Sequence, residues 1–170
     1  MLFLRFDDRT QAIEDATKAL AMRPLRAEGH VARGCLYMYS IGSEPDEEDD
    51  GRIKAMKSFD QALELEPHCI AALHYRADML AREPTLWIDA LIAYDKAIRT
   101  HGEDRRNPLL GILLAARASI LVNFAQHEAI SDAERAVQLA PREPIAYIVL
   151  GDILDHSREY ERAAEMFGKA

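Results

Sequence analysis

The sequence predicts an all-α fold built from repeated helices, and three observations support this prediction. Alanine, the residue with the highest helix propensity, accounts for 27 of the 170 residues, whereas valine and threonine, which favour strands, together account for 8. A pattern of small and aromatic residues at helical spacing occurs five times along the chain. In three of the copies a proline follows at the same distance, which marks the end of a helix because proline cannot continue one.

Each copy of the pattern has alanine, then alanine, phenylalanine or tyrosine four positions later, then alanine three positions after that. These spacings place all three residues on one face of a helix. Small residues on such a face allow a second helix to approach closely. The copies are Ala12-Ala16-Ala19, Ala55-Phe59-Ala62, Ala90-Tyr94-Ala97, Ala129-Ala133-Ala136 and Ala163-Phe167-Ala170. The prolines that follow three of them are Pro24, Pro67 and Pro141, and Gly102 takes this place after the third copy.

A second kind of amphipathic helix lies between these copies and carries a small residue in the middle. Its members are Arg33-Gly34-x2-Tyr37, Arg76-Ala77-x2-Leu80, Arg117-Ala118-x2-Leu121 and Tyr147-x2-Leu150-Gly151-x2-Leu154. The two kinds therefore alternate along the chain. We expect helices over residues 9–22, 26–40, 52–65, 69–82, 86–100, 108–123, 127–139, 143–156 and 159–170.

This alternation resembles the tetratricopeptide repeat (TPR) family, whose pattern is W-x2-L-G-x2-Y…A-x3-F…P with a period of 34 residues. The resemblance is clearest in the last copy, through Tyr147, Leu150, Gly151, Leu154, Tyr160, Ala163 and Phe167. It implies a right-handed α-solenoid, or superhelix, of antiparallel helix pairs. Residues 1–170 would form a single array. Its parts are a partial repeat over 1–24, repeats over 27–67, 70–102 and 108–141, and a truncated repeat over 144–170.

Two segments lengthen the period, one over residues 42–51 and a shorter one between Thr100 and Pro108. The first holds six acidic residues within positions 44–50, so the rest of the chain is close to neutral although the net charge is −8. We expect a solvated loop here, because dense like charges repel one another. The alternative is an electrostatic attraction for a basic partner segment.

Composition excludes several classes of function. The negative charge argues against nucleic-acid binding and against a polybasic membrane surface, and no apolar run is long enough to span a bilayer. Two cysteines are too few for a disulfide framework, so we expect a reducing, cytoplasmic location.

No catalytic or cofactor-binding motif is present. The chain has no phosphate-binding loop and no nucleophile motif, and His127-Glu128 lacks the second histidine of a zinc pair. His30 with Cys35, and Cys69 with His74, are five residues apart, which places each pair on different sides of a helix. We therefore expect a non-catalytic protein without cofactor or metal.

Trp87 is expected to be a packing residue at the start of its helix. Arg33, Arg76 and Arg117 precede the small residues of the second helix type. We expect them to lay their stems over neighbouring helices with the charged heads in water, and a basic ladder is the alternative.

The TPR resemblance implies that the first helix of each repeat lines a concave groove that binds a peptide or protein segment. Apolar positions there would anchor apolar side chains, and Asp152 with Asp155 would favour a basic group. The candidate partner-binding residues are Val31, Cys35, Met38, Tyr39, His74, Asp78, Arg82, Ser119, Val122, Asn123, Ile148, Asp152, Asp155 and His156.

Some TPR domains grip the C-terminal carboxylate of chaperones with a Lys/Asn/Arg clamp, and that clamp is missing from the matching positions here. Those positions carry Val31, Cys35, Tyr75, Ile112 and Ala116, or, one repeat on, His74, Asp78, Ala116, Ile145 and Val149. Because the chain begins and ends inside repeats, we also expect a fragment, or ends that meet a partner. The alternatives to groove binding are therefore self-association through open repeat ends, and a regulatory appendage of an enzyme in a longer chain.

Overall fold

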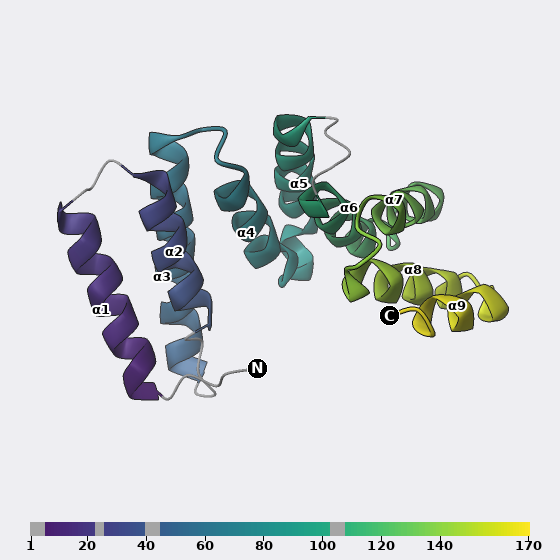
Figure 1. The fold of residues 1–170 in the computed structure, drawn as a ribbon, viewed down its shortest axis with the longest axis horizontal. Helices are drawn as coiled ribbons and strands as arrows, with labels where there is room; N and C mark the ends of the chain where they lie inside the picture. Colours follow the sequence, from purple (N-terminus) through teal and green to yellow (C-terminus); the bar gives the residue numbers. More distant parts are fainter. Residues whose placement is uncertain (1–5, 23–25, 40–44, 103–107) are drawn as a thin grey trace. The chain divides into compact units, whose positions relative to one another are not determined.

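The computed structural model describes residues 6–22, 26–39, 45–102 and 108–170, and within these ranges the secondary structure is entirely helical. They form nine α-helices and one short 3-10 helix, so the all-α prediction is confirmed (Figure 1). The chain divides into two compact units, Met1–Met79 and Leu80–Ala170, which are described separately below. The continuity of the predicted repeat array across them stays a prediction.

The first unit contains α1 (Phe6–Met22), α2 (Ala27–Tyr39), α3 (Pro45–Leu65) and most of α4 (Ile70–Ala81). Helix α2 packs against both α1 and α3, and the three lie side by side (Figure 1). Two apolar clusters hold the unit together. One joins Val31 to Ala62 and Ala72, and the other joins Met38 to Phe59 and Met79. Each cluster therefore draws residues from α2, α3 and α4.

The second unit contains the 3-10 helix η1 (Pro84–Leu86), α5 (Trp87–His101), α6 (Pro108–Leu121), α7 (Gln126–Leu139), α8 (Pro144–His156) and α9 (Tyr160–Phe167). Each of its α-helices packs against the next one along the chain, and α6 also packs against α8. This second contact brings together the first helices of two successive pairs, which is the arrangement that positions the candidate site.

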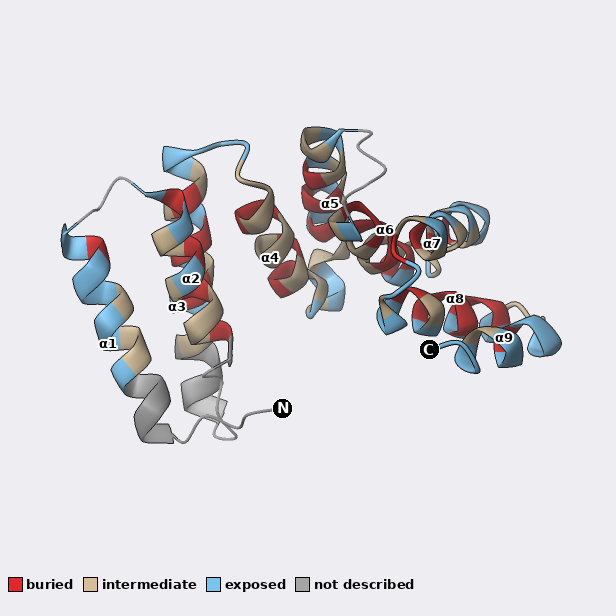
Figure 2. Cartoon of the chain, in the orientation of Figure 1, coloured by how far each residue is buried: buried red, intermediate tan, exposed pale blue. Residues whose placement is uncertain are grey.

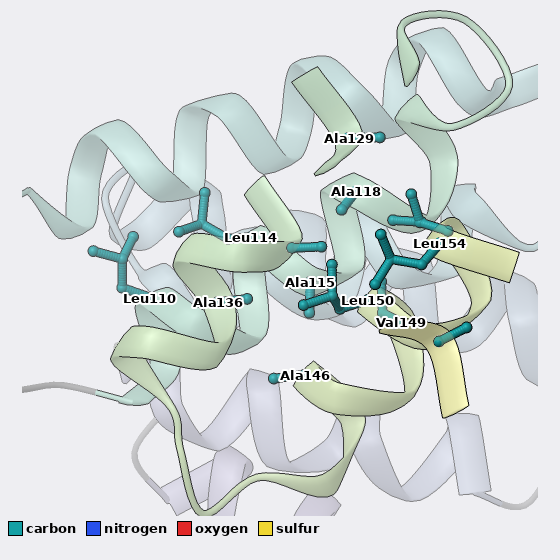
Figure 3. Packing of buried hydrophobic residues seen from close by; sticks show 13 residues of the cluster. Leu110, Leu114, Ala115, Ala118, Ala129, Ala136, Ala146, Val149, Leu150 and Leu154 are labelled. Atoms are coloured by element: carbon teal, nitrogen blue, oxygen red, sulfur yellow. The ribbon is translucent and has the colours of Figure 1, made fainter. Parts of the chain in front are cut away.

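The predicted alanine face is buried in the three middle copies, whereas Ala19 of the first copy and Ala170 of the last are exposed. The alanines of the copies that begin at Ala55, Ala90 and Ala129 are fully buried, as are Phe59 and Tyr94 at two of the central positions. Figure 2 shows bands of buried residues on α3 and α5. In the second unit the buried alanines meet larger side chains of α6 and α8, among them Leu114 and Leu154 (Figure 3). Leucines of one helix thus pack against the small residues of another.

Helix α3 corrects the prediction of a loop over residues 42–51. It begins at Pro45, seven positions before the expected start at residue 52, so residues 45–51 are helical. Proline at the first position has its φ preset for a helix, which favours a start at Pro45. The like-charge repulsion that favoured a loop is outweighed in this position. Residues 42–44 of that segment lie outside the described residues.

The other helix boundaries agree with expectation to within three residues. Helices α3 and α7 end two residues before Pro67 and Pro141, as the stop signals predict. Gly102 follows α5 with a φ of 72°, a backbone angle that favours glycine. Pro24 and residues 103–107 of the second lengthened segment lie outside the described residues.

Candidate partner-binding site

A cavity of about 260 Å³ lies between the C-terminal halves of α6 and α8. Its walls come from one face of each helix, with spacings of three and four residues that continue into the turn after α6. The lining residues are Ser119, Val122, Asn123, Val149, Asp152, Ile153 and His156.

The cavity has an apolar floor and a polar rim. Val149 and Ile153 are buried in the main cluster of the second unit, and Val122 is half-buried against the same cluster. The four polar residues of the lining are exposed. Asp152 is the one carboxylate among the seven lining residues, so the rim can pair with a cation.

Two of the rim side chains are already oriented by their own helix. The hydroxyl of Ser119 donates to the carbonyl oxygen of Ala116 at 2.7 Å, and the amide nitrogen of Asn123 donates to that of Ile120 at 3.1 Å. The Ser119 oxygen and the Asn123 carbonyl oxygen therefore keep acceptor capacity for a ligand. Together with Asp152 they make the rim predominantly an acceptor surface.

Five of the fourteen predicted partner-binding residues line this one cavity: Ser119, Val122, Asn123, Asp152 and His156. Ile148 and Asp155 are exposed on α8 but are not part of the lining, and Arg82 is exposed after the end of α4. Val149 and Ile153 were not predicted as partner-binding residues. They share the helical spacing of Asp152 and His156, so the spacing alone could have found them.

In the described part of the first unit, the predicted residues line neither of the two cavities that involve α3. Val31 and Met38 are 9% exposed and pack in the two apolar clusters. His74 lies 3.4 Å from Asp78 on α4, so these two side chains pair with each other. The side chain of Tyr39 lies outside the described residues.

Cys35 is half-buried and packs against both apolar clusters of the first unit. Burial raises the pKa of its thiol above the ordinary value, and a hydrogen bond with Tyr75 opposes this only in part. The thiolate is the nucleophilic form of cysteine, so Cys35 should react slowly with alkylating reagents at neutral pH.

We therefore expect Cys35 to be alkylated by iodoacetamide at pH 8 several times more slowly than N-acetylcysteine. The rate should increase only at a pH above the midpoint of the free thiol. The variant Cys69→Ser isolates this reaction, and mass spectrometry follows it. Urea-unfolded chain is the control and should react like the free amino acid. An equally fast reaction of the folded chain would contradict the buried setting.

Trp87 has the packing role that the sequence predicts. Its indole nitrogen donates to the carbonyl oxygen of Ala81 at 3.0 Å, and its ring meets Phe124 edge-on at 5.9 Å between centroids. This contact fixes the start of α5 against the turn after α6.

The arginine heads, by contrast, do not simply point into water, so that expectation is wrong. Arg76 Nε donates to Asp60 at 2.8 Å, and Arg117 binds Asp132 and Asp95. Arg33 donates to Ser58 and Gln61. Each guanidinium thus bonds to acceptors on the alanine-pattern helices α3, α5 and α7, which the sequence spacing alone does not reveal.

Neither a metal centre nor a membrane span is found in the parts that the structure describes. There, no three histidine, cysteine or acidic side chains gather closely enough to hold an ion. Within the same ranges, no helix combines the length and the hydropathy needed to cross a bilayer.

Comparison with known proteins finds similarity at the level of structure. No family model matches the sequence, and no curated protein is similar to it in sequence. Among solved structures, PilF of Pseudomonas aeruginosa has a TM-score of 0.75 at 18% identity, covering 96% of this chain and 68% of PilF. A structure of MamA has a TM-score of 0.66 at 18% identity, covering 99% of this chain and 94% of that one. MamA from Desulfovibrio magneticus RS-1 has a TM-score of 0.70 at 17% identity, covering 95% and 83%.

These similarities define the class of fold. PilF and MamA are TPR proteins, so the chain has the fold of an all-α helical solenoid of the TPR type. The resemblance predicted from the alternating helices is confirmed for the fold. At identities below 25% the comparison carries no information about the partner.

Proposed function

We propose that the chain is a non-catalytic protein-interaction scaffold whose second unit binds a peptide or protein segment between α6 and α8. The observation that carries this proposal is the convergence of five predicted groove residues on one cavity. Their positions in the predicted repeats indicate these residues independently of the cavity. The TPR type of fold supports the same function by analogy.

The chemistry of the cavity indicates the kind of segment that fits. A volume of about 260 Å³ accepts one side chain rather than a whole peptide. Val122, Val149 and Ile153 offer apolar contact for the aliphatic stem of a lysine or arginine, and Asp152 offers a carboxylate for its charged head. We therefore propose a partner segment with a basic residue beside apolar anchors. We also propose that the chain does not bind the C-terminal carboxylate of chaperones, since the sequence lacks the clamp residues at the matching positions.

Peptides selected on the full chain from a random library test the proposal. They should be enriched in sequences with lysine or arginine next to aliphatic residues. Asp152→Lys should lower the affinity for the best peptide about tenfold, because it places a positive charge beside the positive group of the ligand. Calorimetry measures this change. Glu161→Lys, at an exposed position of α9, makes the same change of net charge and should alter affinity less than about twofold. Equal losses in both variants, or peptides without basic residues, would contradict the site.

Self-association is a second candidate function, favoured by exposed apolar side chains on the last two helices. Ile145 and Ile148 on α8 are 45% and 39% exposed, and Tyr160 and Phe167 on α9 are 61% and 43% exposed. Exposed aromatic residues are common in protein interfaces. Light scattering distinguishes the two functions. An apparent mass that increases with concentration, and that Tyr160→Glu abolishes, favours self-association.

A further inference from the structure

A second pocket, of about 250 Å³, lies between α2 and α3 in the first unit and differs in charge from the rest of this acidic chain. Among the residues whose side chains the structure describes, its lining includes three cationic side chains and no carboxylate. The lining residues are Arg33, Tyr37, Lys54, Lys57, Ser58 and Gln61. From this lining we propose that the pocket binds an anionic side chain of a partner protein, a carboxylate or a phosphorylated hydroxyl. This inference is independent of the cavity between α6 and α8.

The internal repeats provide the comparison that supports the proposal. Arg33 precedes the small residue of α2 as Arg117 precedes that of α6. In the second unit, Asp132 of α7 accepts two hydrogen bonds from Arg117, to Nε at 2.7 Å and to Nη2 at 2.9 Å. Asp132 stands immediately before the central residue of its alanine pattern. Ser58 stands immediately before Phe59, the central residue of the α3 copy. Arg33 thus meets a serine where Arg117 meets a carboxylate.

At the position equivalent to Asp95, helix α1 does not supply a carboxylate for Arg33 either. Asp95, immediately after the central residue of the α5 pattern, is the second acid of Arg117, and Asp60 at the same place in α3 binds Arg76. Helix α1 has Thr17 at this place, and its hydroxyl donates to the carbonyl oxygen of Ile13. The two positions equivalent to the acids of Arg117 therefore carry hydroxyl residues, Ser58 and Thr17, in the first unit.

The hydrogen bonds of Arg33 among the described residues are made to neutral groups. Its Nε donates to Ser58 Oγ at 3.2 Å and its Nη2 donates to Gln61 Oε1 at 2.6 Å, while Nη2 also lies 3.4 Å from His30 Nδ1. A guanidinium that is partly buried among neutral acceptors keeps its attraction for an anion.

The other cations of the lining extend this attraction toward the opening. Lys54 and Lys57 are exposed on α3, and Lys54 Nζ lies 6.0 Å above the centre of the Tyr37 ring. A wider hollow of about 680 Å³ continues along α3 and shares Lys57 and Gln61 with the pocket. Asp60 and Glu64 line that hollow, so the negative group of a ligand is favoured at the end where Arg33 lies.

Nuclear magnetic resonance of the full chain tests the proposal through the Nε–H signal of Arg33. Three probes are added separately: inorganic phosphate, and two otherwise neutral octapeptides with a central glutamate or a central phosphoserine. We expect at least one peptide to shift the Arg33 signal and to bind more tightly than free phosphate. The stronger peptide identifies the carboxylate or the phosphorylated side chain as the natural group. A signal that no probe moves, or that phosphate alone moves, overturns the proposal.

Three variants make the test specific. Ser58→Asp supplies the missing carboxylate from within the chain and should abolish peptide binding. Lys57→Gln should weaken binding about fivefold, and Lys96→Gln, an exposed lysine of α5, should leave it unchanged. Because Ser58 is buried, Ser58→Asp is checked first by its melting curve, and Lys57→Gln carries the test if that variant does not fold. Equal effects of Lys57→Gln and Lys96→Gln would show non-specific attraction and overturn the site.

Discussion

Replacing Gly34 with valine should destabilise the first unit, Met1–Met79, by about 3 kcal/mol, or about 12–24 °C in the melting temperature of that unit. A Cβ atom at Gly34 would lie 2.4 Å from the ring of Phe59, which is far inside van der Waals contact. Phe59 is fully buried against α2 and α4, so its ring has no free space into which to move. The gain in helix propensity over glycine, below about 1 kcal/mol, does not offset this clash. Scanning calorimetry of the full chain measures the change.

Gly151 provides the matched control, because a Cβ there would lie 2.5 Å from the ring of Phe167 in the equivalent contact. Phe167 is 43% exposed, so its ring can swing toward solvent. Gly151→Val should therefore cost about 1 kcal/mol or less. Adding Phe59→Leu to Gly34→Val should recover stability, with a coupling energy of at least about 1 kcal/mol. Equal losses at the two glycines, or no coupling, would contradict the steric explanation.

The sequence predicts the helices well because two signals agree at each of them. Alanines at spacings of four and three define the buried face, and prolines or Gly102 define where three of the helices end. Close approach requires small residues where a neighbouring helix packs, and the alanines of the copies that begin at Ala55, Ala90 and Ala129 are buried for this reason. The start of α3 differs from the prediction because repulsion among the acidic residues favours a loop, whereas Pro45 at the first position favours a helix.

The candidate site was only partly predictable, because helical spacing gives the direction of a side chain but not what covers it. Ser119, Val122 and Asp152 share a face that stays open between α6 and α8. Val31 and Met38 occupy the corresponding face of α2, yet the clusters with α3 and α4 bury them. The side chains that neighbouring helices contribute decide this difference, and the sequence of one helix considered alone does not contain that information.

Asp132→Ala should destabilise the second unit by about 2 kcal/mol, the larger of two effects around Arg117. The Asp132 side chain is 13% exposed and accepts two hydrogen bonds from a guanidinium that is 22% exposed. Burial by itself lowers the pKa of Arg117, but Asp132 and Asp95 together raise it above its usual value. The guanidinium therefore stays charged when Asp132 is removed, and it remains partly buried with one carboxylate fewer. Chemical denaturation with urea measures the loss.

Asp95→Ala is the matched control at the same arginine, because the Asp95 side chain is 45% exposed. It should cost only about 0.5–1 kcal/mol, and about 1 M salt should remove most of that cost while leaving most of the Asp132 effect. Replacing Arg117 and Asp132 together, by methionine and leucine, should recover at least half of the loss, since no unpaired charge remains buried. A double variant as unstable as Asp132→Ala would mean that the geometry of the ion pair itself, and not the charge left behind, holds α6 against α7.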